Sequence, residues 1–189
     1  MSHPGSGSSI PGTLAPAQTA WLSQFVRAIP DYPQAGILFR DITPLLQNAN
    51  ALRFAIETMA EHYRGMGIEQ VVGIESRGFI FGTPLAYMLG TGFVPVRKKG
   101  KLPHDTISIE YDLEYGSNVL EVHTDAVKPG QRVLVVDDLL ATGGTTAGTV
   151  QLMERLGARV VSLAFLIELA ALNGRALLTG RDVFALLAF

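Results

Sequence analysis

A buried apolar run that ends in two adjacent acids and a Gly/Thr turn constrains this chain more than any other feature. Val133–Asp138 has the composition of a buried strand, and its last two residues are Asp137 and Asp138. Two glycines follow within Ala141–Thr145, before a helical pattern that continues to about Leu156. In open parallel sheets, ligands bind beyond the carboxyl ends of the strands. The chain is therefore predicted to form a ligand site at the edge of a parallel sheet.

The turn itself has the composition of a phosphate-binding loop. Thr142, Gly143, Gly144 and Thr145 precede the helix, where free backbone N–H groups and the positive end of the helix dipole attract a phosphate. The Asp137–Asp138 pair would repel a bare phosphate, but it can accept hydrogen bonds from two adjacent sugar hydroxyls. The alternative is that the acids cap a helix and the glycines only turn the chain. Strand, acid pair and Gly/Thr helix start together favour a ribose phosphate site.

The remaining segments extend an α/β pattern. Short apolar runs predict further strands at 71–75, 93–97, 160–167 and 183–189. Helical spacing predicts helices at 16–29, 51–64 and 79–89, although Thr83 as a cap and Pro84 as first residue would let the last one begin later. A Pro- and Gly-rich loop is expected at 30–44, and alternation over 106–123 predicts an antiparallel hairpin. The predicted fold is a mostly parallel sheet flanked by helices.

Composition bounds the domain count, the partners and the compartment. The 189 residues fit one domain, so we expect a disordered leader at 1–15 and a single domain over 16–189. With 15 Lys and Arg against 17 Asp and Glu, the net charge of -2 lacks the basic excess of a nucleic-acid binder. The longest nearly apolar stretch, 160–172, is shorter than the ~20 residues of a membrane span. Because cysteine is also absent, we expect a cytoplasmic protein without nucleic-acid or membrane partners.

Two more segments carry polar groups that suit an anionic ligand. Glu75–Gly78 follows a predicted strand, so Arg77 is expected at the same edge of the sheet. Arg97–Lys101 holds four of the 15 basic residues, although a solvated basic turn is the usual alternative. A hydrolase nucleophile at Ser76 is set aside, because Ile74 stands where that motif needs a glycine.

Five segments together resemble the type I phosphoribosyltransferases, and among them the members that use adenine. The segments are IPDYPQAGILFRDITPLL, GIESRGFIFG, VRKKGKLP, EYDLEYG and VLVVDDLLATGGTT. The similarity extends from about Ile29 to the C-terminus. It implies that family's α/β fold, with a flexible antiparallel hairpin as a lid over roughly 99–118 and an N-terminal segment as a hood.

The resemblance implies transfer of the phosphoribosyl group of 5-phosphoribosyl 1-pyrophosphate to N9 of adenine, giving AMP and pyrophosphate in purine salvage. It also implies a homodimer and Mg²⁺ bound through substrate oxygens and water, with no residue binding the metal directly. Two alternatives stay open: a phosphoribosyltransferase for another base, and a non-enzymatic regulator that senses the same sugar phosphate. Enzymes for 6-oxopurines place a Lys on the strand after the phosphate-loop helix. No Lys follows Lys128 here, which favours adenine.

The resemblance also implies roles for individual residues. The ribose phosphate set is Asp137, Asp138, Ala141, Thr142, Gly143, Gly144 and Thr145. The pyrophosphate set is Ser76, Arg77, Lys98, Lys101 and His104, with Arg97 near a subunit interface. The adenine set is Leu38, Phe39, Arg40 and Leu169. At the tip of the hairpin, Glu114 is implied to handle a proton of the base and Tyr115 to cover the reacting centre.

Overall fold

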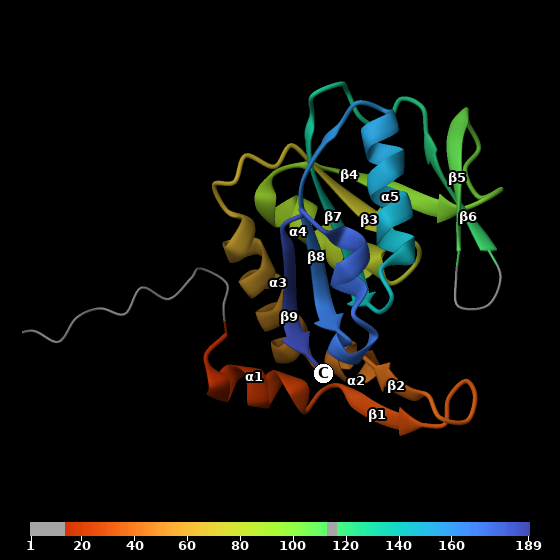
Figure 1. Cartoon of the computed structure of the whole chain (residues 1–189). Coiled ribbons are helices and arrows are strands. Elements are labelled where there is room, and N and C mark those ends of the chain that lie inside the picture. The colour runs from red at the N-terminus through yellow and green to blue at the C-terminus, as the bar shows by residue number, and fades with distance from the viewer. Residues whose placement is uncertain (1–13, 113–116) are drawn as a thin grey trace, which may run out of the picture. The chain divides into compact units, whose positions relative to one another are not determined.

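The computed structural model describes residues 14–112 and 117–189, and the chain divides into two compact units. The first unit comprises residues 1–62 and the second comprises residues 63–189. Two compact units can belong to one folding domain, so the single domain over 16–189 stays a prediction. Figure 1 shows the elements along the chain.

The first unit combines helices with a two-stranded antiparallel sheet. Its elements are α1 (Pro16–Ser23), β1 (Arg27–Pro30), β2 (Leu38–Asp41), α2 (Thr43–Gln47) and α3 (Ala49–Tyr63), the last of which ends in the second unit. Strands β1 and β2 pair with Ile29 opposite Phe39. The Trp21 ring packs edge-on against Phe25 and Phe54, which gives this unit an aromatic cluster.

The helix predicted over 16–29 and the loop predicted over 30–44 are both wrong in part. Helix α1 ends at Ser23, and residues 27–30 and 38–41 form the β1–β2 pair inside the two predicted segments. Ile29 precedes Pro30, and a residue before proline avoids the helical region. The ladder to β2 then satisfies backbone groups that a longer helix would have bonded internally.

The second unit contains a seven-stranded sheet within its described residues. In spatial order the strands are β5 (Thr106–Asp112), β6 (Ser117–His123), β4 (Gly92–Lys98), β3 (Gln70–Ile74), β7 (Arg132–Leu140), β8 (Arg159–Glu168) and β9 (Val183–Ala188). The five strands from β4 to β9 run parallel, and the β5–β6 hairpin joins antiparallel to β4. The mostly parallel sheet and the hairpin of the sequence prediction are confirmed.

Two helices cover this sheet through its alternating side chains. Helix α4 (Gly78–Leu89) packs on β3, β4 and β7, whereas α5 (Gly144–Arg155) packs on β5, β6, β7 and β8. Val72, Ile74 and Val150 belong to one buried cluster with side chains of β4 to β8. Short 3₁₀ helices, Ala170–Leu172 and Gly174–Leu178, precede β9. Over the described ranges, no helix has the length and apolar character that crossing a bilayer would need.

Helix α4 begins at Gly78 and contains Pro84, so the later start at Thr83–Pro84 is wrong. Proline inside a helix costs about 3 kcal/mol because a backbone donor is lost. Burial of Phe81 and Leu85, both 0% exposed, offsets that cost, since fully burying one such side chain contributes about 1.5–3 kcal/mol.

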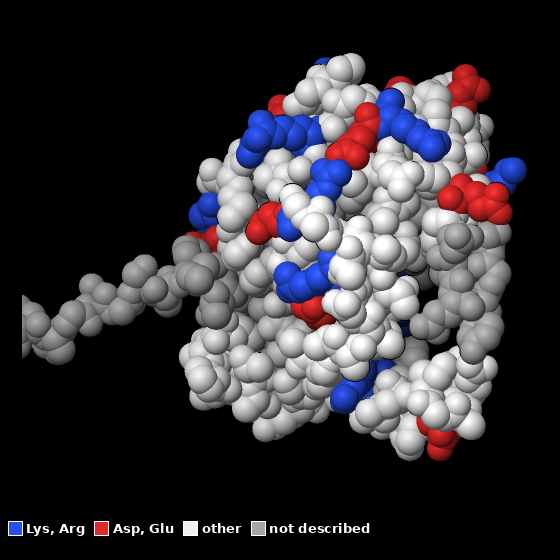
Figure 2. Space-filling view, in the orientation of Figure 1, with Lys and Arg blue, Asp and Glu red and all other residues white. Residues whose placement is uncertain are grey.

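Charged side chains on the second unit occur in part as pairs of opposite sign. Arg175 donates to both carboxylate oxygens of Glu168, at 2.7 to 3.0 Å, and Arg181 lies 2.7 Å from Glu154. On the face drawn in Figure 2, basic and acidic groups accordingly lie beside one another. The residues coloured there form no extended field of a single sign.

Candidate active site

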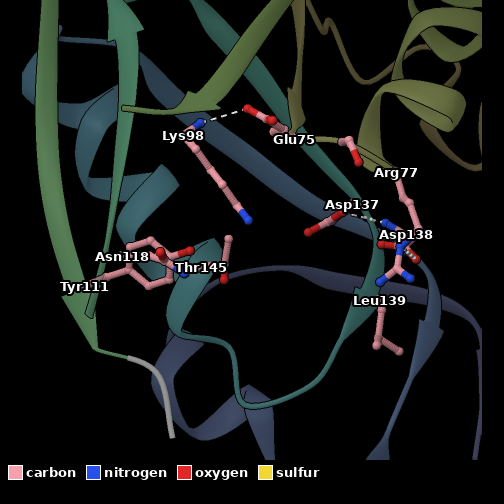
Figure 3. Close-up of a pocket in the computed structure, with 10 residues that line it drawn as sticks. Glu75, Arg77, Lys98, Tyr111, Asn118, Asp137, Asp138, Leu139 and Thr145 are labelled. Atoms are coloured by element: carbon pink, nitrogen blue, oxygen red, sulfur yellow. Dashed lines mark hydrogen bonds and ion pairs between the residues drawn. The ribbon is translucent and has the colours of Figure 1, made fainter. Parts of the chain in front are cut away.

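A cavity of about 470 Å³ lies at the carboxyl ends of β3, β4 and β7, where ligands of parallel sheets bind. Figure 3 shows the side chains around it. The lining residues are Glu75, Ser76, Arg77, Lys98, Tyr111, Asn118, Asp137, Asp138, Leu139 and Thr145. Six of them were predicted to bind ribose phosphate or pyrophosphate. The structure therefore brings the two predicted subsites to one cavity.

The acid pair lies inside β7, which continues beyond it to Leu140. The backbone N–H of Asp138 donates to Asp137 Oδ1 at 2.8 Å, and Asp138 Oδ2 lies 2.8 Å from Arg77 Nε. Figure 3 shows Asp138 against Arg77 and the Asp137 carboxylate extending into the cavity toward Lys98. An arginine predicted for pyrophosphate and an acid predicted for ribose are thus bonded to each other.

Burial raises the pKa of both carboxyl groups. For Asp137, burial is joined by the charge of Asp138, and the pKa lies well above its usual value. For Asp138, burial is opposed by the Arg77 guanidinium, and its pKa is still raised. Hydroxyl groups that donate to these carboxylates would favour the ionised forms. The pair is therefore suited to a ligand that supplies hydrogen-bond donors.

Gly78 lets α4 begin directly against β7. A Cβ at this position would lie 2.7 Å from the carbonyl oxygen of Val136 and 3.1 Å from Asp137 Oδ1. Any larger residue would push the helix start away from the strand. The close approach places Arg77, the residue before α4, beside Asp138.

Glu75 anchors the basic segment that follows β4. Its carboxylate, with only 7% of the side chain exposed, accepts the Lys98 backbone N–H at 2.8 Å. Arg97 Nε donates to it at 3.3 Å and Lys101 Nζ at 2.5 Å. Burial raises the pKa of Glu75, but the hydrogen bonds from Lys101 and Lys98 and the Arg97 charge outweigh burial, and the net pKa is lowered. Glu75 therefore remains ionised and holds three residues of the segment.

The basic segment divides into one side chain at the cavity and others bonded elsewhere. Figure 3 shows the Lys98 side chain extending into the cavity toward Asp137 and Thr145. Lys101 is bonded to Glu75 instead and is not one of the lining residues. Arg97, expected near a subunit interface, also donates Nη1 to the Lys101 carbonyl at 3.3 Å.

Glu121 of β6 is a second anchor of this segment. It is 4% exposed and accepts the backbone N–H groups of Lys101 and Leu102, at 2.9 and 3.0 Å. Burial opposes ionisation, yet the backbone donors lower the pKa of Glu121 overall. Two buried carboxylates, Glu75 directly after β3 and Glu121 in β6, thus fix the loop that presents Lys98.

The Gly/Thr turn encloses a smaller cavity of about 60 Å³ that shares Asp137, Leu139 and Thr145 with the first. Its remaining lining residues are Leu140, Ala141, Thr142, Gly143, Gly144 and Thr146. Helix α5 starts at Gly144, and the first N–H groups of a helix have no partner within it. The predicted phosphate loop is therefore next to the acid pair, with donors available for an anion.

The backbone of Gly174 supports this turn from behind. Gly143 has φ +88°, and a Cβ there would lie 2.5 Å from the Gly174 carbonyl oxygen. A Cβ on Gly174 would overlap the Ala141 carbonyl. Both positions therefore need glycine, and the geometry of the turn depends on a segment about 30 residues further along the chain.

Two predicted residues of the second unit lie outside the large cavity. His104 is exposed, and its ring centroid is 6.0 Å from that of His123. Leu169 follows β8 and donates its backbone N–H to the Leu140 carbonyl at 2.9 Å, which attaches it to the start of the phosphate turn. The structure thus places Leu169 near the ribose phosphate loop and His104 away from the lining.

The other predicted residues belong to the first unit or to the tip of the hairpin. Leu38, Phe39 and Arg40 form most of β2, and the Phe39 ring packs edge-on to Tyr32 at 5.2 Å. Glu114 and Tyr115 lie outside the described residues. Their roles stay predictions.

Sequence reasoning missed several residues of this site, among them Glu75, Tyr111, Asn118 and Leu139 of the large cavity and Gly174 behind the turn. A signal existed for Glu75, because an acid that ends one strand lies beside the basic end of its parallel neighbour. Tyr111 and Asn118 lie opposite each other in the β5–β6 register. The predicted hairpin therefore already implied that these two residues are neighbours. Gly174 gave no signal, since it contacts the turn only through tertiary structure.

Comparison with known proteins gives consistent results. Residues 41–177 match the family model described as the phosphoribosyl transferase domain. The chain is 60% identical over 168 residues to the adenine phosphoribosyltransferase of Carboxydothermus hydrogenoformans, over 89% of this chain and 99% of that protein. The crystal structure of adenine phosphoribosyltransferase from Thermoanaerobacter pseudethanolicus has a TM-score of 0.88 at 51% identity, over 90% and 99% of the two chains. The Saccharomyces cerevisiae enzyme, complexed with an imino-altritol bisphosphate and adenine, has a TM-score of 0.84 at 39% identity, over 89% and 98%.

Proposed function

The chain belongs to the phosphoribosyltransferase family and, within it, to the adenine phosphoribosyltransferases, and from this membership we propose how its residues divide the reaction. The enzyme transfers the phosphoribosyl group of 5-phosphoribosyl 1-pyrophosphate to adenine. The bond from the anomeric carbon to adenine N9 forms, the bond from that carbon to pyrophosphate breaks, and N9 loses its proton. The products are AMP and pyrophosphate. This reaction replaces the two alternatives left open by the sequence.

The observation that supports this assignment best is a pair of adjoining cavities with complementary parts. Asp137 and Asp138 offer acceptors for the two ribose hydroxyls, and the 141–145 turn offers backbone donors for the 5′-phosphate. Arg77 and Lys98 supply positive charge on the side toward β3 and β4. A sugar that carries a phosphate at one end and a pyrophosphate at the other needs these three parts in this order.

Ribose binding requires the Arg77–Asp138 pair to change partners in part. In the structure the guanidinium occupies one oxygen of Asp138 at 2.8 Å. A bound diol would supply new donors to the acids, while the pyrophosphate would supply new acceptors to Arg77. The substrate thus offers hydroxyl donors to Asp138 and phosphate acceptors to Arg77. Arg77 can then stabilise the charge that develops on the leaving pyrophosphate.

We assign Ser76, Arg77 and Lys98 to the pyrophosphate on the basis of their place in the lining. Lys101 and His104 remain proposed contacts of the same group, and Lys101 would have to leave Glu75 to reach it. Leaving-group departure places positive charge on the ribose ring, so water must be excluded until the base attacks.

Mg²⁺ is proposed as the cofactor and fits the donors present at the cavity. The described residues contain no group of three His, Cys, Asp or Glu side chains placed to hold a metal. The carboxylates of Asp137 and Asp138 are nearby, and Mg²⁺ commonly binds through substrate phosphates and water with few protein ligands. When bound, it would neutralise the charge of the pyrophosphate.

Contacts with adenine stay proposals drawn from the family resemblance. Phe39 would stack on the ring, with backbone groups of Leu38 and Arg40 on its Watson–Crick edge and Leu169 on the other face. Glu114 would handle the proton of the base, and Tyr115 would cover the reacting centre.

A homodimer and a cytoplasmic location are also proposed. Helix α4 leaves two apolar side chains exposed, Tyr87 at 87% and Ile80 at 39%. Exposed apolar side chains on one helix suit burial against a second copy. Arg97 is the next-to-last residue of the neighbouring strand β4, where such an interface would continue.

Replacement of both acids tests the assignment of the cavity. The double variant Asp137→Asn/Asp138→Asn keeps the side-chain size but removes the charged acceptors, so KM for phosphoribosyl pyrophosphate should rise about 100-fold or more. The measurement is steady-state kinetics with each substrate varied, beside circular dichroism for folding. Asp182→Asn, an exposed control, should change neither KM for phosphoribosyl pyrophosphate nor the circular dichroism spectrum. Unchanged kinetics in the folded double variant would contradict the assignment.

A further inference from the structure

The segment that follows β8 packs against the Gly/Thr turn of residues 141–145 at two points. Leu169 donates its backbone N–H at 2.9 Å to the carbonyl of Leu140, directly before the turn. Gly174 lies behind the middle of the turn, since a Cβ on Gly143 would be 2.5 Å from the Gly174 carbonyl oxygen. The segment between these two contacts therefore supports the turn from behind.

An ion pair joins the two ends of this supporting segment. Arg175 Nε donates to both carboxylate oxygens of Glu168, at 2.8 and 3.0 Å, and Arg175 Nη2 donates to Oε2 at 2.7 Å. Glu168 is the last residue of β8, and its side chain is 12% exposed. The third guanidinium nitrogen, Nη1, donates at 2.9 Å to the carbonyl of Val183, the first residue of β9. Arg175 thus attaches the end of the segment to two strands of the sheet.

The form of this contact distinguishes it from an ordinary surface ion pair. An exposed ion pair with a single contact contributes little to stability, whereas an arginine that meets a carboxylate through two N–H groups also fixes the orientation of both side chains. The side chain of Glu168 is also more sheltered than that of Glu154, which pairs with Arg181 and is 42% exposed. Within the segment, Asn173 has φ +50°, a conformation that a non-glycine residue keeps only where the surrounding structure holds it. The Glu168–Arg175 pair provides such a hold.

We propose that Glu168 and Arg175 are positioning residues for the 5′-phosphate of the substrate and act on it through Gly174 and the Gly/Thr turn. This inference rests on the proposed function, because it takes the turn as the site of that phosphate. Backbone N–H groups bind an anion well only when they are held in position toward it. Without the ion pair, Gly174 would be free to move, and the turn would lose the contact that fixes it. Neither side chain lines the cavities of the site, so both act through the backbone.

Two single variants test the pair, with AMP as the probe. Arg175→Lys keeps the positive charge but cannot meet the carboxylate through two N–H groups, and Glu168→Gln removes the negative charge. In each variant the Kd for AMP, measured by calorimetric titration, should rise about tenfold, the effect of losing one charge-assisted hydrogen bond. KM for adenine, which has no phosphate, should be nearly unchanged at saturating phosphoribosyl pyrophosphate. The phosphorus magnetic resonance signal of bound AMP should also move toward its position in free AMP, which a loss of overall stability alone would not cause.

The matched controls are Arg181→Lys and Glu154→Gln, which alter the other ion pair and should bind AMP as the wild type does. An equal loss of AMP affinity in these controls would overturn the proposal. So would a wild-type Kd and phosphorus signal in a folded Arg175→Lys or Glu168→Gln enzyme, with folding checked by circular dichroism. Loss of folding in both single variants would show a purely structural pair and would overturn it as well.

The double variant Glu168→Gln/Arg175→Lys separates a joint role from two independent ones. Either substitution already breaks the same contact, so the double variant should bind AMP about as weakly as each single variant. A loss of about a hundredfold would mean that the two residues act separately, and would contradict the proposal. Wild-type enzyme that neither binds AMP nor converts adenine would contradict the proposed function instead.

Discussion

At the scale of single residues, the site carries charge at an energetic cost. Asp137 is inside a strand, next to Asp138, and both have a raised pKa because they are buried. An acid with a raised pKa in the folded state binds more protons there than in the unfolded chain. Stability is then lost as pH rises above the unfolded value of about 3.9. The acid pair therefore lowers the stability of the fold at neutral pH, and its role is to bind the ligand.

Asp137→Asn should consequently raise the free energy of unfolding at pH 7, because the amide avoids the ionisation that burial opposes, while it lowers activity. The amide keeps an acceptor for the Asp138 N–H but cannot ionise. The gain should shrink as pH falls toward about 4, because the wild-type carboxyl then binds a proton in the unfolded chain as well. Thermal unfolding between these pH values is the measurement, with exposed Asp125→Asn as the control. A variant that is less stable at pH 7 than at pH 4, relative to wild type, would contradict this account.

Glu75 should act on the reaction through the basic segment. Glu75→Gln removes the charge that holds Arg97, Lys98 and Lys101. KM for phosphoribosyl pyrophosphate should rise about tenfold, with a small change in KM for adenine. Glu69→Gln is the matched control, because Glu69 also accepts a backbone N–H, from Arg132, but away from the cavity. If both substitutions changed KM for phosphoribosyl pyrophosphate equally, Glu75 would have only a structural role.

At the scale of elements, the start of α4 positions Arg77 because the helix touches β7. Gly78→Ala should destabilise the fold by about 1–3 kcal/mol and raise KM for phosphoribosyl pyrophosphate, since the new methyl group would lie 2.7 Å from a carbonyl oxygen. Gly148→Ala in α5 should stabilise by about 0.5–1 kcal/mol, because its nearest neighbour would be an ordinary 3.5 Å away. Denaturant unfolding of both variants checks the pair. A neutral Gly78→Ala would refute the close approach.

The elements with regular periodicity were predictable from sequence, and the exceptions have physical causes. Strand β8 and helix α3 lie within two residues of the predicted bounds, because buried runs and helical spacing are local signals. The β1–β2 pair was missed, since two strands of four residues, neither with a fully buried side chain, depend on each other for their hydrogen bonds. Pro84 suggested a late helix start, but the burial of α4 decides where that helix begins. Tertiary contact overrides local preference in both cases.

At the scale of the whole molecule, the ordering of motifs along the chain predicted which strand ends meet. The acid pair, Arg77 and Lys98 are about 20 to 60 residues apart in sequence, and the parallel sheet brings them to one cavity. Sequence could indicate that Glu75 lies beside the basic segment, but not that Glu121 also holds that segment or that Arg77 bonds to Asp138, because these contacts depend on side-chain directions. The sequence thus predicted which residues meet at the cavity better than it predicted the hydrogen bonds and ion pairs among them.

The most direct test of the account is the choice of base. Adenine presents an amino donor at carbon 6 and an acceptor at nitrogen 1, whereas hypoxanthine and guanine present the reverse. The lining of the active site offers no Lys from β8 for a 6-oxo group, because Val160–Ile167 is uncharged. Sites built on hydrogen bonds reject such analogues by about 10⁴-fold. With saturating phosphoribosyl pyrophosphate and Mg²⁺, kcat/KM for adenine should exceed the values for hypoxanthine and guanine by about that factor. Comparable values for either 6-oxopurine would contradict the account.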